Sequence, residues 1–265
     1  FLPPRKGTSS YGERLVARGA RGPANYPRRM IRFLVILGAL LAAVSEIRAQ
    51  EPPPAQWLRL DPLPAEMKLT PRESFDGVPP RFVLLTDGSV FVGGRREVLR
   101  GFLDKAEMQA ISTRLDVAMK SVGRASPPTL VMGQGQGEGE GSAIFRFSVL
   151  LGAPLQVVVM GKVPPAGAPA LPPLPDFIRR LAGFRHPSLK PWDPAEFTMV
   201  VREKTLPGGC RAAKGLPSLA QAVSGEVTVP EKLTHGFPTG PDMAQVCEGP
   251  KRYTVVFRPL IPGGR

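Results

Sequence analysis

Histidine chemistry in this chain depends on two residues, His186 and His235. His186 is followed by Ser188 and Asp193, so a serine hydrolase triad can be drawn from neighbouring residues. No G-x-S-x-G motif surrounds Ser188, however, and known triads are assembled from segments that lie far apart in the chain. We therefore predict that His186 forms hydrogen bonds with backbone in a turn where prolines have removed donors. A secreted hydrolase that uses His186 or His235 is retained as the alternative.

Metal and phosphate chemistry have weaker support. Both histidines can be combined with Glu231 or Asp242, but the chain has no H-x-x-x-H or H-E-x-x-H spacing. Glu138 and Glu140 lie in a stretch where every second residue is glycine. These carboxylates would repel a phosphate, so a cation is the better candidate for that stretch. We expect no catalytic residue, no metal and no cofactor.

The two cysteines, Cys210 and Cys247, do not form a C-x-x-C pair, which disfavours redox catalysis and structural zinc. In an oxidising compartment the expected state is one disulfide between them. Closing a loop of about 37 residues stabilises a fold by roughly 4 kcal/mol in the chain-entropy model. We also expect this bridge to compensate for a thin hydrophobic core in the loop-rich stretch that it closes.

Residues 30–49 have the three parts of a secretory signal. Arginines surround the start, an apolar run covers residues 33–44, and a small residue, Ala49, ends the segment. The apolar run has about 12 residues, whereas a helix needs roughly 20 to span a bilayer, so we expect no stable membrane anchor after cleavage. Met30 is then the expected translation start, and residues 1–29 are upstream sequence.

The net charge of +13 overstates the basicity of the expected mature chain. Residues 1–49 contain nine basic and two acidic residues, which leaves 26 basic and 20 acidic residues and a net charge of +6. The basic residues are scattered and not interleaved with aromatic residues, so we expect no nucleic-acid binding. Arg185, Arg211, Lys251 and Arg252 can form an anion-binding patch for cell-envelope polymers near the disulfide, although a solvated basic surface is the simpler interpretation.

Short runs of β-branched and aromatic residues predict strands. Residues 81–85 and 90–92 flank Asp87-Gly88, the residue pair of a tight hairpin turn, and therefore predict a β-hairpin. Residues 143–150 and 155–160 predict a second strand pair. Further strands are predicted at residues 129–132, 197–203, 226–229, 244–246 and 253–257.

Two helices are predicted between these strands. Asp104 and Glu107 form the pattern of a capping box, and an apolar stripe at three- and four-residue spacing follows until Gly123. Asp176 is predicted to cap a short second helix that ends at Gly183. The fold class is therefore α+β, with antiparallel β-hairpins, two helices packed on one face and one disulfide.

Four segments are expected along the chain. In the second of them, Trp57, Leu58 and Leu60 either dock on the domain or belong to a disordered spacer. The segments are 1–49, upstream residues and signal peptide; 50–78, a proline-rich arm; 79–184, an α+β half of β-hairpins and helices; and 185–265, a β-rich half stapled by the disulfide.

Six motifs resemble those of a group of uncharacterised secreted bacterial proteins. They are PRFVLLTDGSVFVGG (80–94), FRHPSLKPW (184–192), LPGGCR (206–211), FPTG (237–240), AQVC (244–247) and KRYTVVFRPLIPG (251–263). The resemblance extends over roughly residues 79–263. It implies one exported α+β unit and assigns no activity.

We therefore expect a periplasmic or secreted protein that serves as a non-catalytic binding or structural module of the bacterial cell envelope. Its partner is an unknown envelope component or protein, engaged for example through an exposed edge of the sheet. The residues with candidate roles are His186, Ser188, His235 and Arg211.

Overall fold

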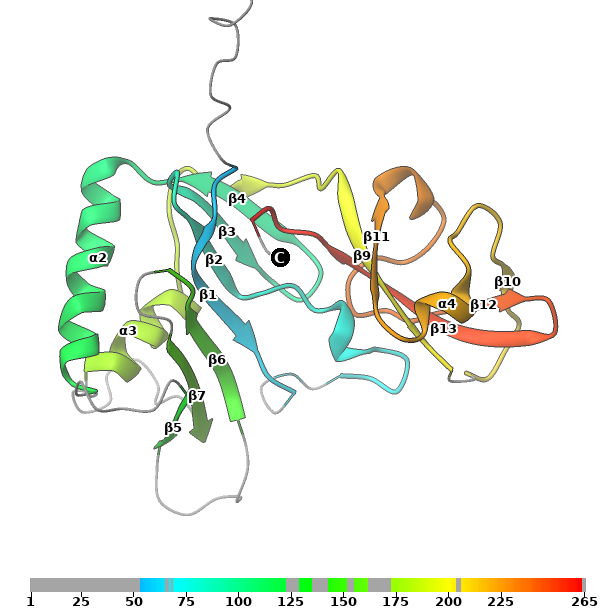
Figure 1. Ribbon diagram of the computed structural model, residues 1–265, viewed down its shortest axis with the longest axis horizontal. Helices are drawn as coiled ribbons and strands as arrows, with labels where there is room; N and C mark the ends of the chain where they lie inside the picture. The colour runs from blue at the N-terminus through cyan, green and yellow to red at the C-terminus, as the bar shows by residue number, and fades with distance from the viewer. Residues whose placement is uncertain are drawn as a thin grey trace, which may run out of the picture. The chain divides into compact units, whose positions relative to one another are not determined.

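The computed structural model describes residues 53–64, 67, 69–122, 129–134, 143–151, 155–161, 173–203 and 206–263. They belong to one compact unit, Pro53–Arg265, which contains two β-sheets (Figure 1). The expected signal peptide and residues 135–141 of the glycine-rich stretch, with Glu138 and Glu140, lie outside the described residues. Among the described residues, no helix is long and apolar enough to cross a membrane.

The first sheet has eight strands, and all neighbouring pairs in it are antiparallel except the parallel pair β5–β7. In spatial order they are β5 (Thr129–Gln134), β7 (Leu155–Gly161), β6 (Ala143–Val149), β1 (Gln56–Pro62), β2 (Phe82–Leu85), β3 (Ser89–Gly93), β4 (Val98–Phe102) and β8 (Lys190–Pro191).

The predicted hairpin is confirmed as β2 and β3. Gly88 has a φ of 89°, which only glycine adopts without strain, and the Ser89 N–H donates to Asp87 Oδ1 at 2.8 Å. The side chain of Asp87 therefore serves the turn. The second predicted strand pair is confirmed as β6 and β7.

Strand β1 lies in the segment that the sequence predicted to be a proline-rich arm. It pairs with β2 on one side and β6 on the other, so it is a central strand. Leu58 and Leu60 are fully buried beneath the helices. For residues 56–62 the alternative of a disordered spacer is therefore wrong. The alternative of docking on the domain is correct, and the segment docks as a strand of the sheet.

Two helices pack on the same face of this sheet, as predicted (Figure 1). Helix α2 (Lys105–Lys120) begins with the predicted capping box: the Glu107 N–H donates to Asp104 Oδ1, and the Asp104 N–H donates to Glu107 Oε2. Its apolar stripe buries Ile111, Leu115 and Ala118 against the sheet.

Helix α3 (Pro173–Ala182) begins three residues before the predicted cap, so the assignment of Asp176 as the cap is wrong. Proline is tolerated in the first helical turn, where the N–H has no intrahelical acceptor. Asp176 lies inside that turn and accepts hydrogen bonds from Arg180 and Arg179 at 2.7 and 2.6 Å. These guanidinium groups, Arg180 foremost, hold the pKa of the Asp176 carboxyl below its usual range.

The second sheet has five strands and confirms four predicted strands. Its neighbouring pairs are antiparallel except β10–β12, which is parallel. The order is β10 (Arg211–Ala212), β12 (Ala244–Glu248), β13 (Lys251–Pro259), β9 (Glu196–Arg202) and β11 (Glu226–Pro230). Short helical segments accompany the two sheets: η1 (Phe75–Gly77), α4 (Leu219–Ala222) and η2 (Glu231–Leu233).

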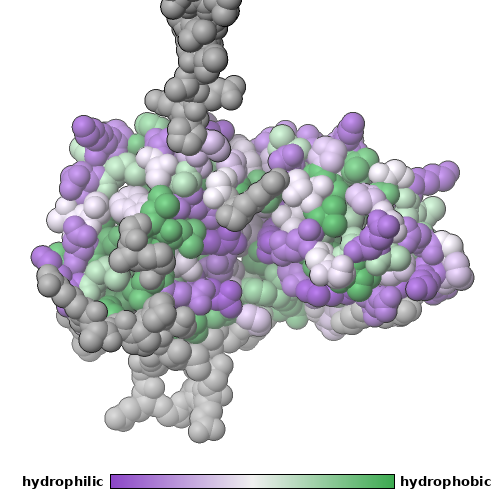
Figure 2. All heavy atoms as spheres, in the orientation of Figure 1, coloured by the Kyte–Doolittle hydropathy of each residue, from purple (hydrophilic) through white to green (hydrophobic). Residues whose placement is uncertain are grey.

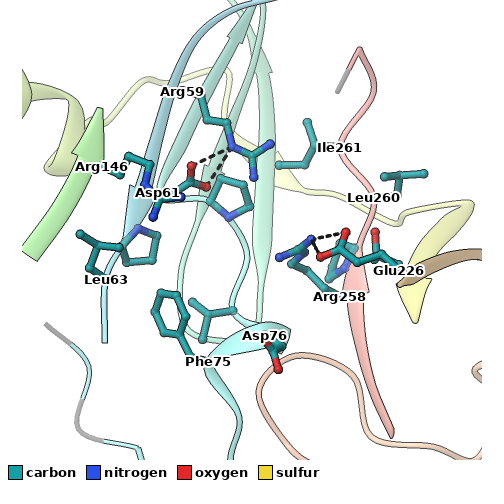
Figure 3. Close-up of a pocket in the computed structure, with 15 residues that line it drawn as sticks. Arg59, Asp61, Leu63, Phe75, Asp76, Arg146, Glu226, Arg258, Leu260 and Ile261 are labelled. Atoms are coloured by element: carbon teal, nitrogen blue, oxygen red, sulfur yellow. Dashed lines mark hydrogen bonds and ion pairs between the residues drawn. The ribbon is translucent and has the colours of Figure 1, made fainter. Parts of the chain in front are cut away.

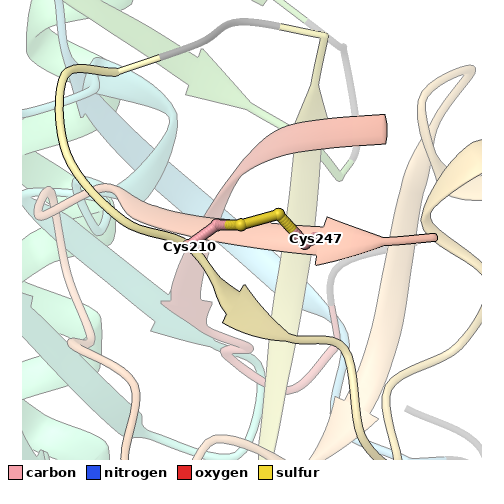
Figure 4. The surroundings of a disulfide bond; sticks show 2 residues. All are labelled: Cys210 and Cys247. Atoms are coloured by element: carbon pink, nitrogen blue, oxygen red, sulfur yellow. A yellow bond between two sulfur atoms is a disulfide. The ribbon is translucent and has the colours of Figure 1, made fainter. Parts of the chain in front are cut away.

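The predicted disulfide joins Cys210, just before β10, to Cys247 of β12, with the Cα atoms 5.6 Å apart (Figure 4). The expectation of a thin core in this half is wrong. The members of its buried cluster occupy every second position along β9 and β13, so no long apolar run marks them in the sequence. Eleven buried residues form the cluster: Phe197, Met199, Val201, Leu219, Ala222, Val229, Ala244, Val246, Tyr253, Val255 and Phe257.

The chain passes from the first sheet to the second between β8 and β9, and the segments after β1 and after β13 make further contacts between the sheets. Gly77 of η1 packs so closely against the Gly240 carbonyl and Val256 that a Cβ atom would clash with both. After β13, Ile261 enters an apolar cluster on the face of the first sheet opposite the helices, beside Phe91. Between these two contacts the sheets leave a cleft.

Candidate functional site: a charged cleft between the two sheets

The cleft has a volume of about 420 Å³ and is lined by β1 and β6 of the first sheet, β9, β11 and β13 of the second, and η1 (Figure 3). This volume lies in the range of small-ligand sites, about 300–1,000 Å³. Hydrophilic side chains gather on the surface between the two sheets (Figure 2). We therefore take this cleft as the candidate functional site.

Alternation along β1 explains why charged side chains line the cleft. Leu58 and Leu60 point toward the helices, so Arg59 and Asp61 lie on the opposite face of the sheet. On β6 the same alternation places Arg146 on that face, directly across from Asp61 in the strand register. The side chains of Arg59 and Asp61 are only 27 % and 24 % exposed.

Six charged side chains line the cleft: Arg59, Asp61, Asp76, Arg146, Glu226 and Arg258. The Arg59 Nε donates to both carboxylate oxygens of Asp61 at 2.9 Å. The Arg258 Nη2 donates to both oxygens of Glu226 at 3.1 Å. Arg202, which is not among the lining residues, forms a 3.3 Å ion pair with Asp76. Each of the three carboxylates is thus paired with an arginine.

Arg146 differs from the other two lining arginines. Its exposed side chain forms no ion pair and no hydrogen bond with any residue in the part of the chain that the structure describes. Apolar surface lies in the same cleft, from Phe75, Leu63, Leu260 and Ile261. The site therefore combines apolar walls, three ion-paired carboxylates and one guanidinium group, that of Arg146, without a described partner.

A second cleft of about 430 Å³ adjoins the first, and both contain Pro62 and Val78 in their walls. Arg81 and Arg95 line the second cleft. Arg81 donates to the backbone carbonyls of Ala182 and Gly93 at 2.8 and 3.2 Å, so in the described chain no carboxylate neutralises its charge.

Glu73 neutralises Arg95 and holds the segment after β1 in place beside the second cleft. Its carboxylate accepts the Thr70 N–H at 2.7 Å and forms ion pairs with Arg95 and Arg96. The Thr70 N–H, followed by Arg95, lowers the pKa of Glu73 below its usual range. Arg96 also pairs with Asp242 at 3.0 Å, so that carboxylate serves a structural contact.

His186 lies in a hydrogen-bonded cluster that the sequence predicted only in part. Its Nδ1 is 2.7 Å from Ser188 Oγ, and its Nε2 is 2.8 Å from Glu107 Oε1. The predicted backbone bond is present, because the Ser188 N–H donates to Nδ1 at 3.3 Å. Asp193, the predicted third member of the triad, has no described bond to His186. The carboxylate that contacts the imidazole is that of Glu107.

Ser188 is held by the backbone of β4. Its hydroxyl accepts the Phe102 N–H at 3.0 Å and lies 3.1 Å from the Phe102 carbonyl, to which it can donate. Ser188 lines neither of the two clefts described above. On the other side of the imidazole, the Asp104 N–H and then His186 lower the pKa of Glu107. The cluster fastens the segment after α3 to β4 and to the start of α2.

The remaining candidates are His235 and Arg211, and the Arg211 guanidinium lies beside Gly236, the residue after His235. His235 is 71 % exposed and only 3.4 Å from Glu231, and no three metal-ligating side chains come together among the described residues. Arg211 lies 5.7 Å over the ring of Phe237. Arg185 follows α3 on the first sheet, whereas the other three residues of the proposed basic patch belong to the second sheet, and no described contact joins it to them.

Comparisons with known proteins add no relative: no family model matches the chain, and neither a curated protein nor a solved structure matches it significantly. The resemblance to uncharacterised secreted proteins therefore remains a prediction. The cleft residues of β1 were missed by the sequence analysis. The alternation in WLRLD (57–61) is the strand signal that could have found Arg59 and Asp61.

Proposed function

We propose that this protein is an exported, non-catalytic binding module of the bacterial cell envelope and that the cleft between its two sheets takes the ligand. The observation that carries the proposal is the cleft itself, with its apolar walls and one arginine, Arg146, that has no ion-pair partner among the described residues. The disulfide indicates an oxidising, non-cytosolic setting, which supports export. Of the four sheet edges, β8 and β10 are weaker candidates, since they have two residues each.

The ion pairs in the cleft favour a binding role over a purely structural one. Arg59 and Asp61 are about three-quarters buried, and Arg258 is 22 % exposed. Desolvating such pairs costs free energy that apolar residues of similar size would not cost. A structural contact between two sheets is more simply made by apolar packing, as Ile261 makes it nearby. Fixed charges in a concave site are typical of ligand recognition.

Filling the cleft tests this proposal without changing its charge. We expect Leu63→Trp, in the wall of the cleft, to abolish co-sedimentation of the mature protein with purified cell-wall sacculi. Leu150→Trp is the matched control, because Leu150 is 42 % exposed and does not line the cleft. The wild type and this control should sediment with the sacculi. Sedimentation of all three proteins would overturn the assignment of the cleft as the binding site, and sedimentation of none would overturn the assignment to the cell envelope.

A hydrolase is the second candidate function, favoured by the distances within Ser188, His186 and Glu107. Because the Ser188 hydroxyl is held by the Phe102 backbone, we expect no covalent labelling of the wild type by a fluorophosphonate probe. Ser188→Ala is the control for background labelling. Labelling of the wild type that disappears in Ser188→Ala would favour the hydrolase instead.

A further inference from the structure

We infer that the ligand of the inter-sheet cleft presents an oxyanion, a carboxylate or phosphate group, and that Arg146 binds it. The inference deepens the proposed binding function and depends on it for the location of the site. It rests on the pairing of charges in the cleft, on the position of Arg146 and on the neighbouring charge of Arg81.

The carboxylates of the cleft are already satisfied by other arginines. Both oxygens of Asp61 accept from Arg59, and both oxygens of Glu226 accept from Arg258. Asp76 is paired with Arg202. The lining therefore has one positive charge, that of Arg146, without a carboxylate partner among the described residues.

Arg146 lies beside an acidic residue that another arginine already pairs. It is the cross-strand neighbour of Asp61, the nearest acidic residue in the register, but the described bonds of that carboxylate come from Arg59, which also balances its charge. In Figure 3 the Arg146 side chain lies on the Asp61 side of the cleft without a bond to it. A guanidinium group offers a rigid fork of N–H donors that matches the two oxygens of a carboxylate or phosphate.

The adjoining cleft strengthens the preference for an anion. Arg81 donates only to backbone carbonyls and so adds a second positive charge that no described carboxylate neutralises. Like charges in a concave site reinforce each other's field and attract the opposite charge. A cationic ligand would be repelled by the same two residues. Phe75 and Leu260 leave apolar surface for the remainder of the ligand.

The test uses small anions and side-chain signals of the mature protein. Titration with inorganic phosphate and, separately, with acetate should shift the Arg146 Nε–H resonance at low salt. With the Nε–H resonances of Arg59 and Arg258 in the same cleft as the signals, we expect Arg146→Gln to weaken anion binding about tenfold or more, as for a lost pair of charge-assisted hydrogen bonds. Arg146→Lys, which retains the charge but not the fork, should show a smaller loss. The anion that binds with the higher affinity identifies the group, phosphate or carboxylate, that the site prefers.

Arg114→Gln is the matched control, because it removes one exposed arginine from α2 outside the cleft. An equal loss in Arg114→Gln and Arg146→Gln, or no anion-dependent shift at Arg146, would overturn the inference. The proposed function fails separately: sacculi binding that is lost in Leu63→Trp but retained in Arg146→Gln removes the oxyanion role and leaves the cleft as the binding site. Anion binding at Arg146 without sacculi binding removes the envelope assignment alone.

Discussion

Leu60→Ala is expected to lower the free energy of unfolding by about 2–5 kcal/mol, the usual cost of truncating a buried leucine. Leu60 is fully buried in β1, between β2 and β6 and beneath the helices. Removing the side chain leaves a cavity at the centre of the first sheet. The free-energy cost of this cavity adds to the lost transfer free energy of the removed atoms. Equilibrium unfolding in urea, followed by circular dichroism, measures the effect.

Leu150→Ala is the control for this prediction, because it makes the same substitution at a residue that is 42 % exposed just after β6. We expect its free energy of unfolding to stay within about 0.5 kcal/mol of the wild type. If Leu60→Ala is equally mild, residues 56–62 are not part of the folded core and the segment is the spacer that the sequence left open. The cleft would then lose the strand that holds Arg59 and Asp61.

Local signals carried most of the correct predictions of fold. The hairpin follows from the turn at Asp87-Gly88, and α2 follows from the capping box of Asp104 and Glu107. Both features are decided by residues within a few positions of each other, so the sequence shows them directly. The disulfide was predictable for another reason, since a chain with two cysteines has one possible internal pairing.

Predictions failed where tertiary contacts override a local pattern. The prolines of residues 50–78 indicated an extended arm, but prolines at the ends of a strand are compatible with a sheet, and β1 ends at Pro62. Strand β4 was missed because its residues VLRGF alternate only weakly and include a glycine. Gly101 is needed there because the Ser188 hydroxyl lies against it.

The candidate site was less accessible from sequence than the fold. Its charged residues come from four strands and one short helical segment, and nothing in a single segment shows that two sheets will enclose a cleft. The same holds for Glu107 and His186, which are 79 residues apart. Glu107 was assigned to the capping box, and that assignment is correct, but its second oxygen has a distant partner that only the packing of α2 reveals.

Replacing both Cys210 and Cys247 by serine is expected to cost about 4 kcal/mol of stability, the chain-entropy value for a closed loop of 37 residues. For a domain of this size the melting temperature should fall by roughly 8–15 °C. The denaturant m-value should rise, because the unfolded chain without the cross-link exposes more surface. Wild type unfolded in the presence of a reductant should reproduce the variant.

The double variant also decides between two accounts of the second sheet. If its core were thin, as the sequence suggested, the variant would lose cooperative unfolding in this half at 25 °C. The loop closed by the bridge contributes buried Leu219, Ala222 and Val229 to a cluster of eleven residues, so we expect a single cooperative transition at lower denaturant. A variant as stable as the wild type would show that the bridge adds nothing. A variant with a separate transition at low denaturant would show that the disulfide, and not the apolar cluster, stabilises the second sheet.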